Sequence, residues 1–263
     1  MKITVLMENT ACREDMASEH GLSLYIETGD LRILFDAGKT CAFADNARIL
    51  SVDLGMVDFA VLSHGHYDHC GGLMRFLQEN DKAPVYVSAH AGRFCYHGPE
   101  KYIGLPEGLL EHPRVILAEK EKEIARGITL CSGADLVPFY PVENFGLQIL
   151  EKDGLVADDF RHEQYLLIRE GEKLVCISGC SHRGILNIVR WFRPDVLVGG
   201  FHFMKLDPAG DGRQTLDHAA GELMETDTKY YTGHCTGEAQ YAYLKTQMGC
   251  RLERLSTGMV VEF

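Results

Sequence analysis

Short apolar runs separated by turn-forming residues follow one another along the first third of the chain. Runs of this kind at residues 3–7, 22–27 and 31–36 predict strands, and the last two flank Thr28-Gly29-Asp30, which predicts a tight turn. A helix is predicted near residues 42–50. The next predicted elements are a strand over 59–63, a helix from 71 to about 80 and a strand over 84–88.

The last third of the chain is also regular. Its predicted elements are strands over 165–168 and 174–178, a helix over 185–192 that ends before Pro194, a strand over 196–198, a helix over 216–225, a strand over 229–232, a helix over 238–248, and strands over 251–256 and 259–263. Several turns therefore lead from the end of a strand into a helix, which is where ligand sites of α/β proteins are found.

The segment between these regular parts, residues 89–160, is the least regular. Prolines, glycines and polar breaks such as His97-Gly98-Pro99-Glu100 interrupt its apolar runs. We predict a single domain over residues 1–263, in which this segment is an irregular excursion that shapes the mouth of a site. Some strand is expected in it near residues 114–118 and 128–131. The alternative is a structural crossover that takes no part in substrate binding.

The turn after the strand at 59–63 carries the strongest chemical signal of the chain. Three imidazoles and one carboxylate lie within six positions, at His64, His66, Asp68 and His69. Neutral imidazole and carboxylate are ligands of zinc, iron and manganese. In extended backbone His64 and His66 project to the same side and can share one ion, whereas Asp68 and His69 can serve a second ion.

Other histidines occupy equivalent positions. The turns at 179–182 and 233–237 follow predicted strands and precede helices, and they carry His182 and His234; a further turn after a strand carries His202. We expect these side chains to converge on one face with the cluster at 64–69. The remaining histidines of interest have no strand-end context and are interpreted as surface or packing residues, with substrate contact as an alternative for one, His97; they are His20, His90, His97, His112 and His218.

Composition narrows the choice of partners. Hydrophobic residues make up 46% of the chain and charged residues 24%, which is ordinary for a globular protein, and no apolar run has a membrane-spanning length. The net charge of −12 disfavours nucleic acid, but a small anionic substrate remains compatible, because metal ions supply local positive charge. The nine cysteines are scattered, and the apolar amino terminus turns acidic at once, so we expect a cytoplasmic protein with reduced thiols and no signal peptide.

The motif at Ser63–His69 resembles the His-x-His-x-Asp-His signature of the metallo-β-lactamase superfamily. The segment Phe35-Asp36-Ala37-Gly38 is similar to its strand-end Asp-x-Gly, and Gly233-His234 to its last ligand turn. The turns beginning at Ser178, Gly199 and Gly233 resemble a subgroup named for 7,8-dihydropterin-6-methyl-4-(β-D-ribofuranosyl)aminobenzene-5′-phosphate synthase. The resemblance implies an αββα sandwich of two mixed sheets and two divalent ions, with zinc expected and manganese or iron as alternatives.

The resemblance also implies a ligand set. The first ion would take His64, His66 and a third histidine, and the second would take Asp68, His69 and His234. The strand that ends in a bridging aspartate in the general pattern ends here in Gly179-Cys180. We predict that His182 completes the first set, with His162 or Glu163 as alternatives. Cys180 is either a bridging thiolate or a small buried cysteine.

These features predict a dinuclear metal-dependent hydrolase or transferase acting on a small anionic metabolite. A dihydropterin-type condensation that displaces pyrophosphate and a phosphoester hydrolysis both fit. Asp68 is expected to orient the nucleophile, and His202 to act as an acid or an orienting group. Asp36 either accepts a hydrogen bond from a ligand histidine or only forms a turn.

Two alternatives from other classes remain open. One is a redox enzyme with a di-iron centre on the same scaffold, and the other is a metal-stabilised binding or sensor protein without turnover. Measuring the bound metal distinguishes the redox enzyme from the hydrolase or transferase. The sequence leaves the oligomeric state open.

Overall fold

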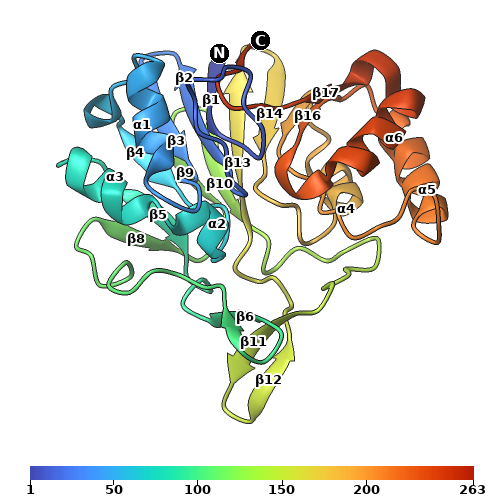
Figure 1. The fold of residues 1–263 in the computed structure, drawn as a ribbon. Coiled ribbons are helices and arrows are strands. Elements are labelled where there is room, and N and C mark those ends of the chain that lie inside the picture. Colours follow the sequence, from blue (N-terminus) through green and yellow to red (C-terminus); the bar gives the residue numbers. More distant parts are fainter.

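The computed structural model describes residues 1–263, and two seven-stranded sheets form its centre (Figure 1). The strands of the first sheet are β1 (Lys2–Met7), β2 (Ser23–Thr28), β3 (Leu31–Phe35), β4 (Phe59–Val61), β5 (Val85–Ser88), β8 (Val115–Ala118) and β18 (Val260–Glu262). They lie in the order β18-β1-β2-β3-β4-β5-β8. The pairs from β18 to β3 are antiparallel and those from β3 to β8 are parallel, so the sheet is mixed.

The second sheet repeats this arrangement. Its strands are β9 (Lys122–Ala125), β10 (Ile128–Ser132), β13 (Gln164–Glu170), β14 (Lys173–Ile177), β15 (Val196–Val198), β16 (Lys229–Thr232) and β17 (Leu252–Arg254). Read in the order β9-β10-β13-β14-β15-β16-β17, it also passes from antiparallel to parallel pairing. Parallel β14, β15 and β16 bring their carboxyl ends to one edge, where the histidine-bearing turns begin.

Helices cover the outer faces of both sheets (Figure 1). They are α1 (Ala42–Ile49), α2 (Tyr67–Cys70) and α3 (Leu73–Glu79) on the side of the first sheet, and α4 (Ile185–Phe192), α5 (Arg213–Met224) and α6 (Glu238–Met248) on the side of the second. Single 3₁₀ turns occur at Leu54–Met56, His234–Thr236 and Gly249–Arg251. The predicted αββα sandwich is confirmed. None of the helices has the length and apolar character needed to cross a lipid bilayer.

Successive side chains of the central strands point alternately into the core between the two sheets and into the core beneath the helices. On β2, Leu24 and Ile26 lie between the two sheets, while Tyr25 packs beneath the helices of the first sheet. On β14, Val175 and Ile177 likewise face the other sheet. Both faces of each sheet are buried, which explains why these strands read as nearly continuous apolar runs in the sequence.

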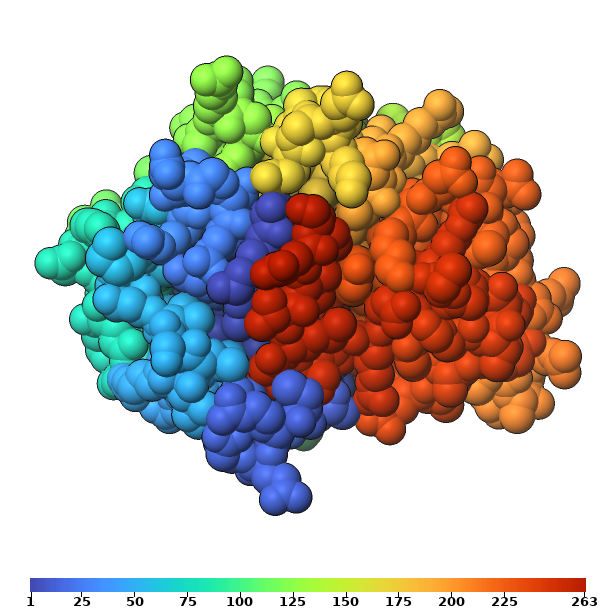
Figure 2. Space-filling model, turned by 90° about the horizontal axis from the view of Figure 1, so that it is seen from above, coloured from blue at the N-terminus to red at the C-terminus, as the bar shows by residue number.

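The chain ends meet in the first sheet. β1 pairs with β18 in antiparallel register, with Thr4 opposite Val260. Figure 2 shows the C-terminal segment lying against the N-terminal segment on this face of the molecule. The first and last strands of the chain thus pair with each other, in addition to the contacts that the two sheets make through the core.

Residues 89–160 contain more strand than the sequence indicated. The strands expected near residues 114–118 and 128–131 are present as β8 and β10. A separate four-stranded sheet, in the order β12-β11-β6-β7, is formed by β6 (Phe94–His97), β7 (Lys101–Tyr102), β11 (Leu147–Glu151) and β12 (Gly154–Ala157). It lies at the end of the molecule away from the termini, and we call it the small sheet (Figure 1).

The helix predicted from residue 71 to about 80 is present as α3, over Leu73–Glu79. A separate short helical turn, α2, precedes it and was not predicted, and this turn carries Asp68 and His69. Gly71 follows it, and a Cβ atom there would lie 2.0 Å from the carbonyl oxygen of Lys39. This close approach packs the end of the metal motif against the loop that follows β3.

The core between the sheets predicts a stability test. Ile177 is fully buried there, so Ile177→Ala should lower the free energy of unfolding by about 2–5 kcal/mol, through lost burial and the cavity left behind. Leu117 on β8 is half exposed, and Leu117→Ala should change the free energy of unfolding by only about 0.5 kcal/mol. Urea unfolding followed by circular dichroism measures both. Equal losses would contradict the assignment of Ile177 to the central core.

Candidate metal centre

Three strand ends bring histidine side chains to one edge of the sandwich. The turn after β4 carries His64 and His66, the turn after β14 carries His182, and the turn after β16 carries His234. All four side chains are buried. The predicted convergence of these histidines on one edge is present in the structure.

Three imidazoles meet at one point, which we call the first donor group: His64, His66 and His182. The Nε2 atom of His182 lies 3.2 Å from Nε2 of His64 and 3.1 Å from Nδ1 of His66. Zinc–nitrogen bonds of about 2.0–2.1 Å in a tetrahedral site place neighbouring ligand nitrogens about 3.3–3.4 Å apart. Both measured distances are close to that value.

A second donor group consists of Asp68, His69 and His234. Nε2 of His69 and Nε2 of His234 lie 3.1 Å apart. The Oδ2 atom of Asp68 lies 3.2 Å from the His234 nitrogen and 3.9 Å from the His69 nitrogen. Two imidazole nitrogens and one carboxylate oxygen therefore face one another, in a combination that divalent transition metals accept.

Asp36 fixes how two of these imidazoles are protonated. Its Oδ2 accepts hydrogen bonds from Nδ1 of His69 and from the hydroxyl of Ser63, both at 2.7 Å. Because the Ser63 hydroxyl donates to Asp36, it must accept from Nδ1 of His64, 2.8 Å away. In the neutral form, both rings thus carry their proton on Nδ1 and leave Nε2 as the nitrogen that can bind an ion. The prediction that Asp36 accepts a hydrogen bond from one of these histidines is confirmed.

Asn9 performs the same function for His234. Its Oδ1 lies 3.0 Å from Nδ1 of His234, so that ring also leaves Nε2 free. Metal-binding histidines usually donate their other ring N–H to such an oxygen. The residues present therefore fit a divalent metal, because the free lone pairs point inward and the protons point outward.

His20 belongs to this site, and the interpretation of it as a surface or packing residue is wrong. Its Nε2 lies 3.3 Å from Oδ2 of Asp68, and its ring centroid is 4.5 Å from that of His234. The Nδ2 amide of Asn9 faces Nδ1 of His20 at 3.5 Å, which leaves Nε2 to donate to Asp68. His20 lies in an irregular loop before β2, so no strand-end pattern could identify it.

Cys180 lies between the two donor groups. Its Sγ is 3.1 Å from Nε2 of His69, and it falls within 4.8 Å of the facing nitrogens of His64 and His69. Burial raises the pKa of the Cys180 thiol. A second buried cysteine, Cys235, lies beside it and was not singled out from the sequence, because a lone cysteine on a turn has no spacing signal.

Neither alternative to His182 faces the donor groups. Nδ1 of His162 accepts a hydrogen bond from the Gly65 amide at 3.1 Å. The carboxylate of Glu163 accepts the backbone N–H groups of His182 and Arg183 at 2.7 and 2.9 Å. Glu163 therefore holds the turn that carries His182, and the structure places His182 in the first donor group.

His202 lies beside the first donor group but belongs to neither group. Its ring centroid is 4.2 Å from that of His182, and its Nδ1 is buried without a hydrogen-bond partner. Its backbone adopts φ = 58°, in the left-handed region that residues other than glycine seldom occupy. Asp36, Ser181 and His234 have similar positive φ values. Strained backbone is thus concentrated at the turns that form the site.

The charges of the site suit a cation. Burial lowers the pKa of His64 and His182 well below the ordinary histidine value, so both present neutral rings. Burial alone would raise the pKa of Asp68, but the facing histidines, His69 first, hold it well below its usual range. Burial also disfavours the charged form of His69, yet the carboxylates of Asp36 and Asp68 raise its pKa to about 9, so this ring would release the proton on Nε2 when it binds an ion.

A pocket of about 220 Å³ opens onto both donor groups. Its wall includes Asp68 and His202, together with His97 of β6, Lys101 of β7 and Lys205. His97 therefore lies in the pocket wall, as expected from the alternative that it contacts the substrate. An adjoining cavity of about 450 Å³ shares His182 and His202 with this pocket, and its other side chains are largely apolar, among them Phe145, Phe201 and Phe203. A larger cavity, about 830 Å³, lies between α4 and α5, away from both groups.

Comparisons with known proteins cover nearly the whole chain. The model of the metallo-beta-lactamase superfamily matches residues 19–169. An uncharacterized protein of Methanocaldococcus jannaschii is 34% identical, over 89% of this chain and 90% of that protein. The 7,8-dihydropterin-6-methyl-4-(beta-D-ribofuranosyl)-aminobenzene-5′-phosphate synthase of the same organism is 27% identical, over 100% and 97%. The crystal structure of Tm1679, described as a metal-dependent hydrolase of the beta-lactamase superfamily, is similar with a TM-score of 0.82 at 30% identity, over 100% and 99%.

The packing around Ser63 predicts that Gly179, on the turn after β14, does not tolerate a side chain. A Cβ atom on Gly179 would lie 2.2 Å from the Ser63 hydroxyl and 3.0 Å from Nδ1 of His64. Gly179→Ala should therefore displace the hydroxyl that orients His64 and weaken zinc binding by about tenfold or more, as measured by competition with a chelator. Gly221 on α5 has no neighbour within 4 Å of such an atom, and Gly221→Ala is the matched control. Equal zinc affinity in both variants would contradict this geometry.

Proposed function

The chain belongs to the metallo-β-lactamase superfamily, and we propose that it is a metal-dependent hydrolase or transferase acting on a small anionic metabolite. The observation that carries this proposal is the convergence of five ring nitrogens and the Asp68 carboxylate in two adjacent groups. Each member comes from a strand-end turn, and oxygen acceptors orient His64, His69 and His234 from outside. Such a set is suited to binding cations.

We propose two divalent ions, one for each donor group, with zinc expected and manganese or iron as alternatives. His64, His66 and His182 would hold the first, and Asp68, His69 and His234 the second. Cys180 is placed to contribute a thiolate between them. When bound, such ions supply Lewis-acid polarisation of the group under attack and stabilise its developing negative charge.

The protein's own side chains supply orientation and proton transfer. Asp68 keeps one carboxylate oxygen directed into the second donor group, where it can accept a proton from the attacking nucleophile, and His20 donates to the same oxygen. His202 stands in the wall of the pocket with an unpartnered Nδ1, a position that suits an acid or an orienting group for the leaving atom. We assign these roles to Asp68 and His202.

The pocket supports an anionic substrate. Lys101 and Lys205 place cationic side chains beside the donor groups on a protein whose net charge is −12. Phosphate or pyrophosphate would meet these lysines, and the adjoining cavity would take an apolar body. The similarity to the synthase supports a dihydropterin-type condensation, and the similarity to the metal-dependent hydrolase structure supports hydrolysis. We propose that pyrophosphate leaves in the condensation and that a phosphoester is cleaved in the hydrolysis.

We also propose that the protein is cytoplasmic and that its partner is a small metabolite. The overall negative charge supports a small metabolite rather than a nucleic acid or a membrane surface. Cys180 and Cys235 lie side by side as free thiols, an arrangement that supports a reducing, cytoplasmic environment.

Removal of one donor tests the proposed chemistry. Asp68→Ala should abolish metal-dependent turnover of phosphoester and pyrophosphate substrates, because it removes both a ligand and the carboxylate that orients the nucleophile. The variant should retain the circular dichroism spectrum of the parent protein. Elemental analysis should find two ions of zinc or manganese per chain in the parent and about one in the variant. Unchanged turnover would contradict the proposal, and a redox-active pair of iron ions would favour the redox alternative.

The lysines of the pocket give a second test. Lys101→Ala and Lys205→Ala should each weaken the binding of inorganic phosphate to the metal-loaded protein by roughly two- to fivefold, the effect of one partly exposed charge. Lys173 is exposed at the start of β14, at the opposite end from the site, so Lys173→Ala serves as the control. Isothermal titration calorimetry measures all three. Equal affinities would show that the lysines do not bind the anion.

A further inference from the structure

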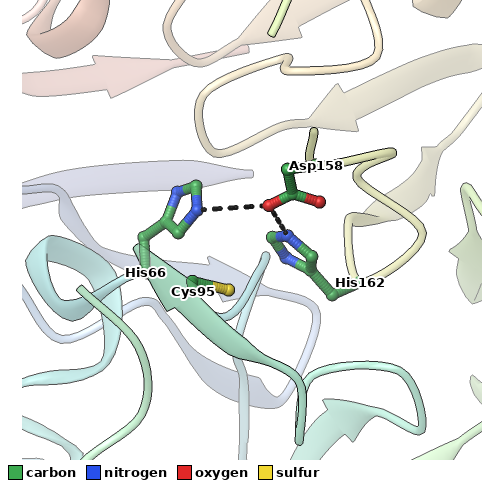
Figure 3. A group of neighbouring side chains, drawn as sticks. All are labelled: His66, Cys95, Asp158 and His162. Carbon is green, nitrogen blue, oxygen red and sulfur yellow. Dashed lines mark hydrogen bonds and ion pairs between the residues drawn. The ribbon is translucent and has the colours of Figure 1, made fainter. Parts of the chain in front are cut away.

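His66 faces two sites at once. Its Nδ1 belongs to the first donor group, 3.1 Å from Nε2 of His182. Its Nε2 points the opposite way, toward Oδ2 of Asp158 at 3.8 Å (Figure 3). That nitrogen is fully buried and has no hydrogen-bond partner in the structure. A buried ring nitrogen aimed at a carboxylate just beyond hydrogen-bond distance calls for an explanation, because an unpaired polar group is costly in the interior.

Asp158 is held in a defined orientation. It is itself buried and follows directly on β12 of the small sheet. One carboxylate oxygen, Oδ1, accepts the backbone N–H of Phe160 at 2.8 Å. The other, Oδ2, lies 3.0 Å from Nε2 of His162 and is the atom that faces His66 (Figure 3). Oδ2 therefore has one ring nitrogen already bound and a second within reach.

The protonation of His162 follows from its other contact. Nδ1 of His162 accepts the N–H of Gly65, so the proton of the neutral ring must lie on Nε2, which donates it to Asp158. Gly65 is the residue between His64 and His66. One buried imidazole therefore holds both the backbone of the metal motif and the carboxylate behind His66.

We propose that Asp158 is a positioning residue for the metal centre. It accepts the N–H of Nε2 of His66 and thereby keeps the proton off Nδ1, the nitrogen that faces the first donor group. His162 fixes Asp158 in this position. A carboxylate behind a metal-binding histidine sets the tautomer and the orientation of the ring. The inference rests on the proposed function, because it assumes that the first donor group binds an ion.

The cluster also contains Cys95, and its side chain lies within 4.8 Å of those of His66, Asp158 and His162 (Figure 3). A third ion held by these four residues is the competing interpretation. It would require Nε2 of His162 to act as a ligand while Nδ1 accepts from Gly65. A neutral imidazole has only one unprotonated nitrogen, so the observed contact favours the hydrogen-bonded arrangement.

A single substitution separates these interpretations. Asp158 faces three N–H donors, from Phe160, His162 and His66, and a carboxylate accepts all of them. In Asp158→Asn only one oxygen remains and the other position carries an NH2 group. The N–H of Gly65 fixes the tautomer of His162, so this ring cannot adapt to the new NH2 group. His66 can adapt, because its proton can move from Nε2 to Nδ1. That change blocks the nitrogen of the first donor group.

The experiment compares the full chain, Asp158→Asn and the control Asp159→Asn after loading with zinc. Asp159 is the adjacent carboxylate, and it is exposed and paired with Arg93. Zinc stoichiometry is measured by elemental analysis, zinc affinity by chelator competition, and histidine tautomers by long-range ¹⁵N–¹H correlation spectra. A His66→Gln variant identifies the signals of His66.

We expect two zinc ions in the parent protein and a proton on Nε2 of His66. Asp158→Asn should lower the affinity for one of the two zinc ions by about 10- to 100-fold and leave the affinity for the other unchanged. Asp159→Asn should behave like the parent. If Asp158→Asn fails to fold, the tautomer of His66 in the parent still decides the question.

Three results would overturn the inference. Unchanged affinity in folded Asp158→Asn, or a His66 ring without a proton on Nε2, would remove the positioning role while leaving the proposed function intact. A third zinc ion that is lost in Asp158→Asn would make Asp158 a ligand instead. A parent protein that binds no zinc, manganese or iron would overturn the proposed function together with the inference.

Discussion

Asp36 lies at the end of β3 with its fully buried carboxylate directed at the end of β4. It accepts the backbone N–H and the hydroxyl of Ser63 as well as Nδ1 of His69. An isolated buried carboxylate would be very costly, and these donors are what make its burial possible. Because the same contacts decide which nitrogens of His64 and His69 stay unprotonated, the two donor groups depend on this one side chain.

The architecture explains why such distant residues can meet. Each large sheet ends in parallel strands, and parallel strands bring their carboxyl ends to a common edge. The turn after β4 comes from one sheet and the turns after β14, β15 and β16 come from the other. The apolar core between the sheets therefore sets the distance across which the two halves of the site face each other.

Much of this arrangement was predictable from local sequence. The helices over 185–192 and 238–248 and the strands over 196–198 and 229–232 have the predicted bounds, because apolar spacing, Pro194 and the glycine turns define them locally. The cluster at 64–69 was visible because its members are close in sequence. The roles of Asp158 and His20 were not, because each depends on a fold contact between segments without a shared motif.

The small sheet was missed for a related reason. Its strands are short and largely exposed, and Leu147 pairs with His97 across a long stretch of intervening chain. Local patterns of apolar residues carry no information about such a pairing. Glu163 shows the same limit, since its contacts with the turn at His182 depend on the path of the chain between the sheets.

The small sheet also has a consequence for how proteins of this architecture can diversify. One strand supplies His97 to the pocket wall and Cys95 to the cluster behind His66, and another leads directly into Asp158. A change in the small sheet that alters the pocket wall at His97 would therefore also disturb the contacts behind His66. Substrate selectivity and metal retention are therefore coupled through the small sheet, and replacing this segment would alter both properties together.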